Sequence, residues 1–390
     1  VCHMLLIFHK FPMNPWKSTL PARPASAMAR LDYSRFNGLG DSDSEDGEKT
    51  QEVSHSDSSS VLAELPSDLP KELSLVLAAR QGQQHLVEAL LANRVDANAV
   101  DPHRGTALLR AVQLGITARP CIEALLKASA DVTRASDLGE TPLSEAAGAG
   151  PTELLQRLLE ASPLALRGSS TLSAALVKAS NVQNRGTTRV LLKHQAPIVP
   201  EAFFGWLQCG DTQMVREMLE HKADVHQPRE HDGETALVLV AASGEAEMIH
   251  LLVRWMAEVD LPNRKGITPL TRASSCRADD VVNALLTSRA SPNAKTCSMS
   301  PLVAAALASS VSTLQLLLDA SASADAMDQH QRTALTAAAA TGSLPSCQLL
   351  LQARANPNTC GRAGSGGDGV APLAIAVAAA HTALVEELLA

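Results

Sequence analysis

The stretch TALVLVAASGEAEMIHLLVRWMAEVD, from Thr235 to Asp260, decides the fold of this 390-residue chain. Its apolar residues fall at helical spacing in two short runs. The runs are separated by Gly244, a residue free to adopt the positive φ that ends many helices. Small residues such as Ala241 allow the two helices to approach closely. The stretch therefore predicts two short helices joined by a tight turn.

The same unit recurs along most of the chain at intervals of 30 to 38 residues. Equivalent positions are Leu73, Thr106, Thr141, Thr171, Glu201, Thr235, Thr268, Ser300, Thr333 and Ala371. One unit cannot bury its apolar stripe alone, whereas a stack of units buries it between neighbours. We therefore predict an all-α solenoid, an architecture that offers a long surface to partners and favours binding rather than chemistry.

Short motifs at both ends of the unit carry a family resemblance. The opening motifs are TPLSEAAGAG (Thr141 to Gly150), TPLTRAS (Thr268 to Ser274), SPLVAAALA (Ser300 to Ala308) and APLAIAV (Ala371 to Val377). Together with closing elements such as KADVH at Lys222 and RANPN at Arg354, they resemble the TPLHxAA and GADVN elements of the ankyrin repeat. The resemblance covers 61–390 in about ten units, the last incomplete. It implies antiparallel helix pairs, hairpin fingers and protein recognition along a concave face.

The sequence departs from the ankyrin pattern at two positions. No unit has His at the fourth position of TPLH, so we expect the polar tie that this His makes between units to be absent. The glycine of GAD is replaced in seven units, by Arg94, Ser129, Lys222, Met256, Arg289, Ser321 and Arg354. If these residues keep the left-handed turn, each costs on the order of 1 kcal/mol relative to Gly. We therefore expect a stack of moderate stability that unravels from its ends.

Composition restricts the function. The chain is 45% hydrophobic but only 2% aromatic, and its formal charge is −8. A nucleic-acid partner is not expected, because the basic field and the base-stacking aromatics of such proteins are missing. No apolar run approaches the ~20 residues of a membrane helix. The seven cysteines form no regular framework, which favours reduced thiols and a cytoplasmic location, with the nucleus as an alternative.

The first sixty residues differ from the repeats. Residues 41–58 hold seven acidic residues and one Lys among serines, a composition that cannot bury enough apolar surface to fold. We therefore predict a disordered leader over 1–60. Within it, Ser42 stands three residues before Glu45 and is a candidate phosphorylation site for an acid-directed kinase. A merely solvated tail is the alternative.

The start of the leader has two further features. Asp32-Tyr33-Ser34 and the acidic serines after it resemble the N-terminus of Cdc37-type co-chaperones, which implies a chaperone partner through this segment. Residues 1–27 contain no acidic residue. We interpret them as a translated leader that precedes a natural start at Met28, and a transit peptide is the alternative.

Patterns typical of catalytic or metal sites stand in the wrong context. Gly364, Gly366 and Gly369 spell GxGxxG, but a phosphate-binding loop needs a preceding buried strand. We interpret them as a loop insertion, which explains the longest repeat interval. The histidines from His221 to His231 lack a further ligand spaced to close a tetrahedral metal site. We expect no enzyme activity, cofactor or metal within the chain.

Candidate partner-binding residues follow from the implied ankyrin geometry. Phe204 stands at the fourth position of TPLH and is a candidate anchor, because aromatic anchors dominate interface energetics. In the alternative, Phe203, Phe204 and Trp206 fill a gap beside the irregular fourth unit. The other candidates are Arg110, Glu145 and Arg272 on first helices, and Asp101, His103, Arg104, Arg229, Glu230, His231, Arg264, Lys265, Gln329, His330 and Arg332 on finger tips. Ordinary solvated surface is the alternative for each.

These observations favour an intracellular scaffold or adaptor that binds a partner protein on its concave face and finger tips. The alternative is a substrate-targeting or regulatory module of a larger enzyme or channel, such as a ubiquitin ligase or an acyltransferase, whose catalytic part lies outside this chain.

Overall fold

The computed structural model describes residues 70–161, 170–230, 232–294, 299–359 and 371–389, all within one compact unit, Ser56–Ala390. Several predictions lie outside the described residues: the disordered leader 1–60 with its acidic segment 41–58, the candidate phosphorylation site Ser42, the finger residue His231, and the glycine-rich insertion at 364–369.

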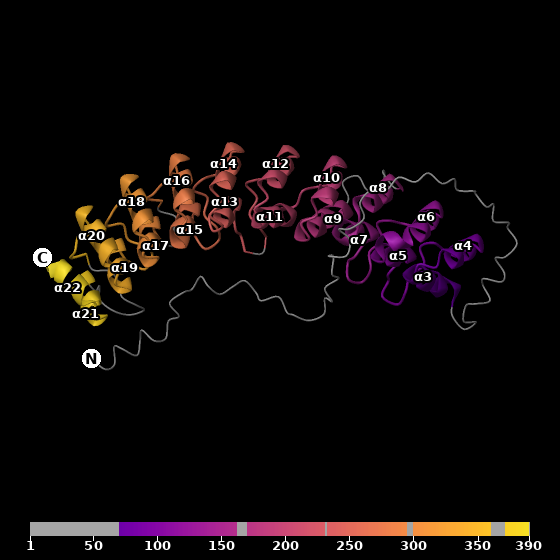
Figure 1. The fold of residues 1–390 in the computed structure, drawn as a ribbon, viewed down its shortest axis with the longest axis horizontal. Coiled ribbons are helices and arrows are strands. Elements are labelled where there is room, and N and C mark those ends of the chain that lie inside the picture. The colour runs from indigo at the N-terminus through magenta and orange to yellow at the C-terminus, as the bar shows by residue number, and fades with distance from the viewer. Residues whose placement is uncertain (1–69, 162–169, 231, 295–298, 360–370, 390) are drawn as a thin grey trace, which may run out of the picture. The chain divides into compact units, whose positions relative to one another are not determined.

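Ten helical pairs follow one another along the described residues (Figure 1), and we number them repeats 1 to 10. The first helices are α3 (Lys71–Gln81), α5 (Ala107–Gln113), α7 (Pro142–Ala149), α9 (Ser170–Asn181), α11 (Pro200–Cys209), α13 (Ala236–Val240), α15 (Pro269–Cys276), α17 (Pro301–Leu307), α19 (Ala334–Thr341) and α21 (Pro372–Ala378). The second helices are α4 (Gln84–Ala92), α6 (Arg119–Lys127), α8 (Thr152–Ala161), α10 (Arg185–Lys193), α12 (Thr212–Glu220), α14 (Ala246–Arg254), α16 (Asp279–Thr287), α18 (Val311–Asp319), α20 (Leu344–Gln352) and α22 (Thr382–Leu389). A short 3-10 helix, η3 (Gly115–Ala118), precedes α6. The predicted all-α solenoid is confirmed.

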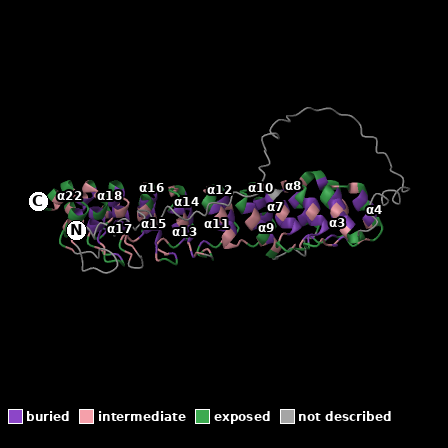
Figure 2. Cartoon of the chain, turned by 90° about the horizontal axis from the view of Figure 1, so that it is seen from below, coloured by how far each residue is buried: buried purple, intermediate pink, exposed green. Residues whose placement is uncertain are grey.

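The core lies between neighbouring repeats. Each first helix packs against the first helix of the next repeat, and buried residues form a continuous band along the stack (Figure 2). In the leucine pairs of the second helices, the first leucine is fully buried, as at Leu90 and Leu285, while the second is often half-buried, as at Leu91 and Leu286. Full burial of a leucine contributes about 1.5–3 kcal/mol. The repeat period therefore places the core.

The Thr or Ser that opens most units is a helix N-cap. Thr106 Oγ1 accepts a hydrogen bond from the N–H of Leu109 at 3.1 Å, and Thr235 Oγ1 accepts one from Val238 at 3.3 Å. Equivalent caps are made by Thr141, Thr268, Ser300 and Thr333. Each cap satisfies a backbone N–H that has no partner within the helix, typically worth about 1 kcal/mol. The opening motif thus sets where each first helix begins.

All seven residues that replace the GAD glycine keep the left-handed turn. Their φ angles run from 59° at Ser129 to 68° at Lys222 and Met256. Gln195 of repeat 4 adopts the same conformation, with φ of 56°. The turn persists because its backbone bonds close the second helix, as in the bond from the N–H of Arg289 to the carbonyl of Leu286 at 3.0 Å. The condition under which each of these replacements costs stability relative to Gly is therefore met.

Polar ties between repeats survive the loss of the TPLH histidine, so the expectation that they are absent is wrong at repeat 7. There, Thr271 Oγ1 donates to the carbonyl of Met299 at 3.2 Å, and this bond joins α15 to the segment that opens repeat 8. The fingers are tied as well. Asn98 Oδ1 accepts from the N–H of Asp131 at 2.7 Å, and Asn293 Oδ1 accepts from the N–H of Ser323 at 2.8 Å. In both cases a side chain of one finger holds the backbone of the next.

Repeat 4 interrupts the row of fingers. Its connection to α11, residues 194–199, is too short for a hairpin finger. The connection from α12 to α13, residues 221–235, is by comparison long enough to form one. The first helices on both sides are longer: α9 has 12 residues and α11 has 10. The repeat register predicts that α11 begins after Glu201, but it begins at Pro200 with Val199 as its N-cap, because Pro is well suited to the first helical position.

Candidate interaction surface

Phe204 is buried, which overturns its prediction as an exposed anchor. Only 1% of its surface is exposed, and its ring packs edge-on against Phe203, with the centroids 6.3 Å apart. The fourth position of the unit faces the neighbouring repeat rather than a groove, since Val238 and Thr271 are buried there as well. The large rings of repeat 5 therefore belong to the interior of the stack.

Four predicted contact residues are tied inside the chain. Arg110 pairs with Asp101, with Nη2 and Oδ2 2.5 Å apart, and Arg272 pairs with Glu234, with Nη2 and Oε1 2.9 Å apart. On the fingers, Arg229 pairs with Asp232, and Arg332 lies 2.7 Å from Asp328. The four arginine side chains are 14% to 29% exposed. Their charges are compensated locally, so they stabilise the finger and first-helix geometry.

Asp101 shows how such a tie is built. Its Oδ1 accepts hydrogen bonds from the N–H groups of His103 and Gly105, and its Oδ2 accepts from the guanidinium of Arg110. Burial acts to raise the pKa of the Asp101 carboxyl, but the hydrogen bonds and the charge of Arg110 outweigh it and lower this pKa below its ordinary value of 3.8. The ionised carboxylate thus organises the first finger and holds it against α5.

Lys178 and Glu145 form a comparable tie between repeats. The ammonium of Lys178 on α9 contacts the carboxylate of Glu145 on α7. The stem of Lys178 also fills the space beside Gly148, where a Cβ atom would meet it at 3.0 Å. Most charges of the first helices in repeats 2 to 7 are therefore used to connect the stack.

The finger tips remain accessible. Arg264, Lys265 and His330 are exposed, as predicted, and so are His103 and Arg104. Arg104 lies only within 4.0 Å of Asp137, and both side chains are largely solvated. The next finger adds Leu138, whose side chain is 85% exposed. We call these six residues the finger-tip row: His103, Arg104, Leu138, Arg264, Lys265 and His330.

Sequence reasoning missed Leu138. The signal was available in an apolar residue directly before Gly139, which adopts a φ of 75° at the tip of its finger. A turn of this kind points its neighbour into solvent and leaves nothing for it to pack against. Leu138 therefore adds one accessible apolar side chain to this finger.

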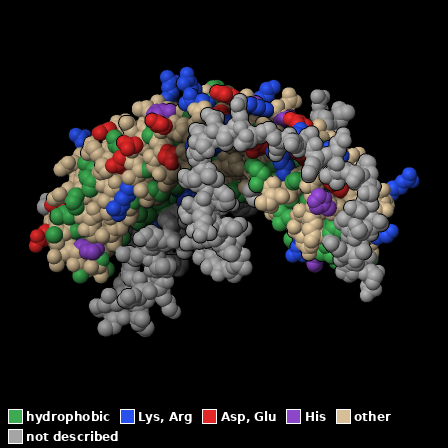
Figure 3. All heavy atoms as spheres, turned by 45° about the vertical axis from the view of Figure 1, so that its right-hand side comes forward, with side chains coloured by type: hydrophobic (Ala, Val, Ile, Leu, Met, Phe, Trp, Pro, Cys, Tyr) green, Lys and Arg blue, Asp and Glu red, His purple; other side chains and the backbone are tan. Residues whose placement is uncertain are grey.

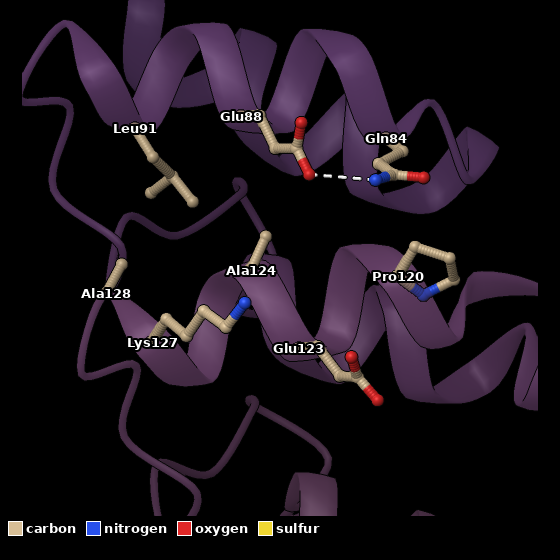
Figure 4. Close-up of a pocket in the computed structure, with 8 residues that line it drawn as sticks. All are labelled: Gln84, Glu88, Leu91, Pro120, Glu123, Ala124, Lys127 and Ala128. Atoms are coloured by element: carbon tan, nitrogen blue, oxygen red, sulfur yellow. Dashed lines mark hydrogen bonds between the residues drawn. The ribbon is translucent and has the colours of Figure 1, made fainter. Parts of the chain in front are cut away.

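The back of the stack has shallow depressions between second helices. One, of about 400 Å³, lies between α4 and α6 (Figure 4). In it, Gln84 donates to Glu88 at 2.8 Å, and Glu123 and Lys127 stand on the opposite helix. Within the described ranges, no group of three or more His, Cys, Asp or Glu side chains is arranged to hold a metal ion. In the same residues, no helix is long and apolar enough to cross a membrane.

Stacked helix pairs with protruding fingers define a helical repeat protein. A family model of ankyrin repeats matches the chain in three copies, at residues 75–167, 206–296 and 291–361. These matches cover more than half of the chain, so the chain belongs to the ankyrin-repeat family, and the predicted resemblance is confirmed. The residues between the first two matches, 168–205, hold repeat 4 and the extended start of α11.

Three curated relatives match parts of the chain. Neurogenic locus notch homolog protein 1 of Xenopus tropicalis is 30% identical over 34% of this chain. Two ankyrin repeat and KH domain-containing proteins, one from Caenorhabditis briggsae and mask-1 of Caenorhabditis elegans, are 28% and 27% identical over 51% and 59% of it. The matched segments span only 6%, 8% and 9% of these relatives. Ankyrin repeats generally mediate protein–protein interaction, and the Cdc37-like stretch gains no support from these relatives.

Proposed function

We propose that this chain is a scaffold or adaptor that binds a partner protein along its finger-tip row. The fold supplies a rigid support, because each repeat is packed and hydrogen-bonded to its neighbours. The fingers then carry side chains that the stack itself does not need.

One observation carries the proposal: the charges of the stack divide into two groups. Arg110, Arg229 and Arg272 are held by carboxylates of the same chain. By contrast, Arg264 and Lys265 are exposed on one finger and His330 on the second finger after it, and they form no ion pair among the described residues. Exposed cations that the stack leaves unpaired favour a partner that is recognised by shape and by local charge pairing.

The test is affinity capture with the full chain as bait, followed by mass spectrometry. Arg264→Glu/Lys265→Glu reverses two tip charges without touching the core. We expect the specific partner to be lost or reduced at least about tenfold, because charge reversal at an interface changes association strongly. The matched control is Lys127→Glu/Arg157→Glu, which reverses two exposed charges on the second helices α6 and α8.

Equal recovery of the partner by the wild type and the finger variant would contradict the proposal that the partner binds along the finger-tip row. A loss that also occurs with the control variant would show that the effect is one of bulk charge. Unchanged circular dichroism melting of both variants is required for either conclusion, and we expect it because all four positions are exposed.

A second candidate function is favoured by the relatives, in which the matched segment is less than a tenth of the whole protein. The chain would then be a targeting or regulatory module of a larger enzyme or channel. Sequencing the full transcript that encodes the chain separates the candidates, because this one predicts a catalytic or channel region in it.

A further inference from the structure

A second surface lies away from the fingers, where the second helices of repeats 5, 6 and 7 end. We call it the basic edge and define it by Arg216, Lys222, Arg254, Trp255, Met256 and Arg289. Lys222, Met256 and Arg289 occupy the same left-handed turn in three consecutive repeats, so they form a row across the stack. Figure 3 shows groups of Lys and Arg side chains along the upper part of the molecule, the side on which Figure 1 places these second helices.

The cations of the basic edge are unpaired. Within the described residues, no ion pair or side-chain hydrogen bond is formed by the four cations Arg216, Lys222, Arg254 and Arg289. This differs from repeat 4, where Arg185 pairs with Asp211 at 2.5 Å and Arg189 pairs with Glu217 at 2.8 Å. Unlike those arginines, the cations of the basic edge do not contribute to the cohesion of the stack.

The nearest acidic side chains do not neutralise this edge. Glu220 lies beside Arg216, and Asp224 and Glu258 follow at the start of the fingers, all exposed. Asp224 already accepts a hydrogen bond from the N–H of His226 at 2.9 Å. None of the three forms an ion pair with the edge within the described residues, so the four cations remain available to carboxylates from outside.

Apolar surface is exposed at the centre of the same edge. Trp255 is 39% exposed and Met256 is 77% exposed, although the chain has only three tryptophans. Beside Trp255 an open hollow of about 490 Å³ lies between α12 and α14, and its lining also includes Leu251, Arg216, Arg254 and Glu220. Trp and Arg are strongly enriched at interaction hot spots.

We propose that the basic edge binds an acidic protein segment that places one apolar side chain in the hollow beside Trp255 and its carboxylates on Arg216 and Arg254. The volume suits one large side chain, and the separated cations suit carboxylates on both sides of it. This site is distinct from the finger-tip row, so it adds a second partner, or a second contact of the same partner, to the proposed function.

An acidic peptide fits this edge better than a nucleic acid does. Nucleic-acid binding needs an extended basic field, and the chain has a formal charge of −8. Single-strand binding also needs several aromatic platforms for successive bases, and Trp255 is the one aromatic side chain of the edge. A hollow with a leucine in its lining instead selects an aliphatic or aromatic side chain.

The test uses the full chain and a fluorescein-labelled acidic peptide, DDELFDED, with binding followed by fluorescence anisotropy. We expect wild-type binding to weaken as the salt concentration rises. In Arg216→Glu/Arg254→Glu we expect the affinity for the peptide to fall at least about tenfold. Lys127→Glu/Arg157→Glu is the matched control, since Lys127 ends α6 as Arg254 ends α14, and it should bind as the wild type does. Arg264→Glu/Lys265→Glu should also bind normally, which separates this site from the finger tips.

The apolar part of the proposal has its own comparison. In the peptide DDEGSDED the apolar pair is replaced, and we expect the wild type to bind it more weakly than DDELFDED. Trp255→Ala should lower the affinity for DDELFDED but should not lower the affinity for DDEGSDED any further. If that variant melts early, Met256→Glu at a more exposed position replaces it. Three results would overturn the proposal: no binding by the wild type, equal binding by Arg216→Glu/Arg254→Glu, or tighter binding of a short thymidine single strand than of DDELFDED.

Discussion

The guanidinium of Arg229 lies over the ring of Phe204, with Cζ 5.5 Å from the ring centroid. Arg229 comes from the finger of repeat 5 and Phe204 from the first helix of the same repeat. Asp232, three residues further along the finger, pairs with the same guanidinium. Two residues that the sequence marks as partner contacts are therefore engaged with each other, and a cation over an aromatic face adds about 0.5–2 kcal/mol.

Phe204→Ala tests this arrangement. Because the ring is buried, its removal leaves a cavity, and we expect the free energy of unfolding to fall by about 3–5 kcal/mol. Urea unfolding followed by circular dichroism measures the change. Leu138→Ala is the control, since an 85% exposed side chain contributes little to folding. A Phe204→Ala protein of unchanged stability that loses its partner would instead support the anchor hypothesis.

The ionised Asp101 carboxylate should make stability depend on pH. Its folded pKa is lowered, so its contribution is present above the unfolded value near 3.8 and is lost as pH falls through the folded value. We expect Asp101→Ala to cost about 2 kcal/mol at neutral pH, and less in acid. Asp137→Ala, at a largely solvated pair 4.0 Å from Arg104, should cost almost nothing. A difference in the free energy of unfolding between wild type and Asp101→Ala that does not change with pH would contradict this account.

At the junction between repeats 4 and 5, the contact between the second helices should depend on ion pairs. No finger bridges it, and α10 and α12 pack less closely than the other neighbouring second helices. Arg185–Asp211 and Arg189–Glu217 join the two helices instead, and Arg189 donates to both oxygens of Glu217 at 2.8 Å. Arg185→Ala/Arg189→Ala should speed amide hydrogen exchange in α10 and α12. High salt should have the same effect on the wild type, because it screens these ion pairs. Uniform protection across the junction in the variant would be incompatible with this.

The left-handed turns offer a route to stabilisation. Replacing Ser129 and Arg354 by Gly should each raise the free energy of unfolding by up to about 1 kcal/mol, because Gly adopts positive φ without a Cβ clash. The gain is limited, because Gly also has more freedom in the unfolded chain. Ala128→Gly is a matched control one position before Ser129, where φ is −83°, and it should not stabilise. Chemical denaturation curves at equal protein concentration measure the three values.

The cysteines should differ sharply in reactivity. Burial, with a smaller effect of Glu387, raises the pKa of the Cys347 thiol to about 12, and burial also raises that of Cys121. Both are inaccessible, whereas Cys276 is exposed. Maleimide labelling with peptide mapping should modify Cys276 rapidly and Cys347 only after unfolding. Because the folded pKa of Cys347 lies above 9, the stability that it contributes should be lost between about pH 9 and 12.

Local signals explain how much of the fold was predictable. Thr106 and Thr235 sit where an N-cap is needed, and residues such as Arg94 and Arg354 sit where a left-handed turn ends the second helix. Such signals depend on a few consecutive residues, so they can be read from the chain directly.

The candidate site was predictable only in part, since exposure at Arg264, Lys265 and His330 matched the expectation from the finger position. For Arg110 and Arg272, the deciding partners are a carboxylate nine residues away and one 38 residues away. Sequence spacing does not specify whether such groups meet at hydrogen-bond distance, because a small change in register separates them.

The sequence by itself determined the repeat, its two helices, their caps and the left-handed turns, since each is a short-range choice of backbone conformation. Only the tertiary structure decided that Phe204 is covered by Arg229, that the charges of the first helices hold the stack together, and that unpaired cations gather beside Trp255. These outcomes depend on which side chains neighbouring repeats bring into contact, and that is set by packing across the whole stack.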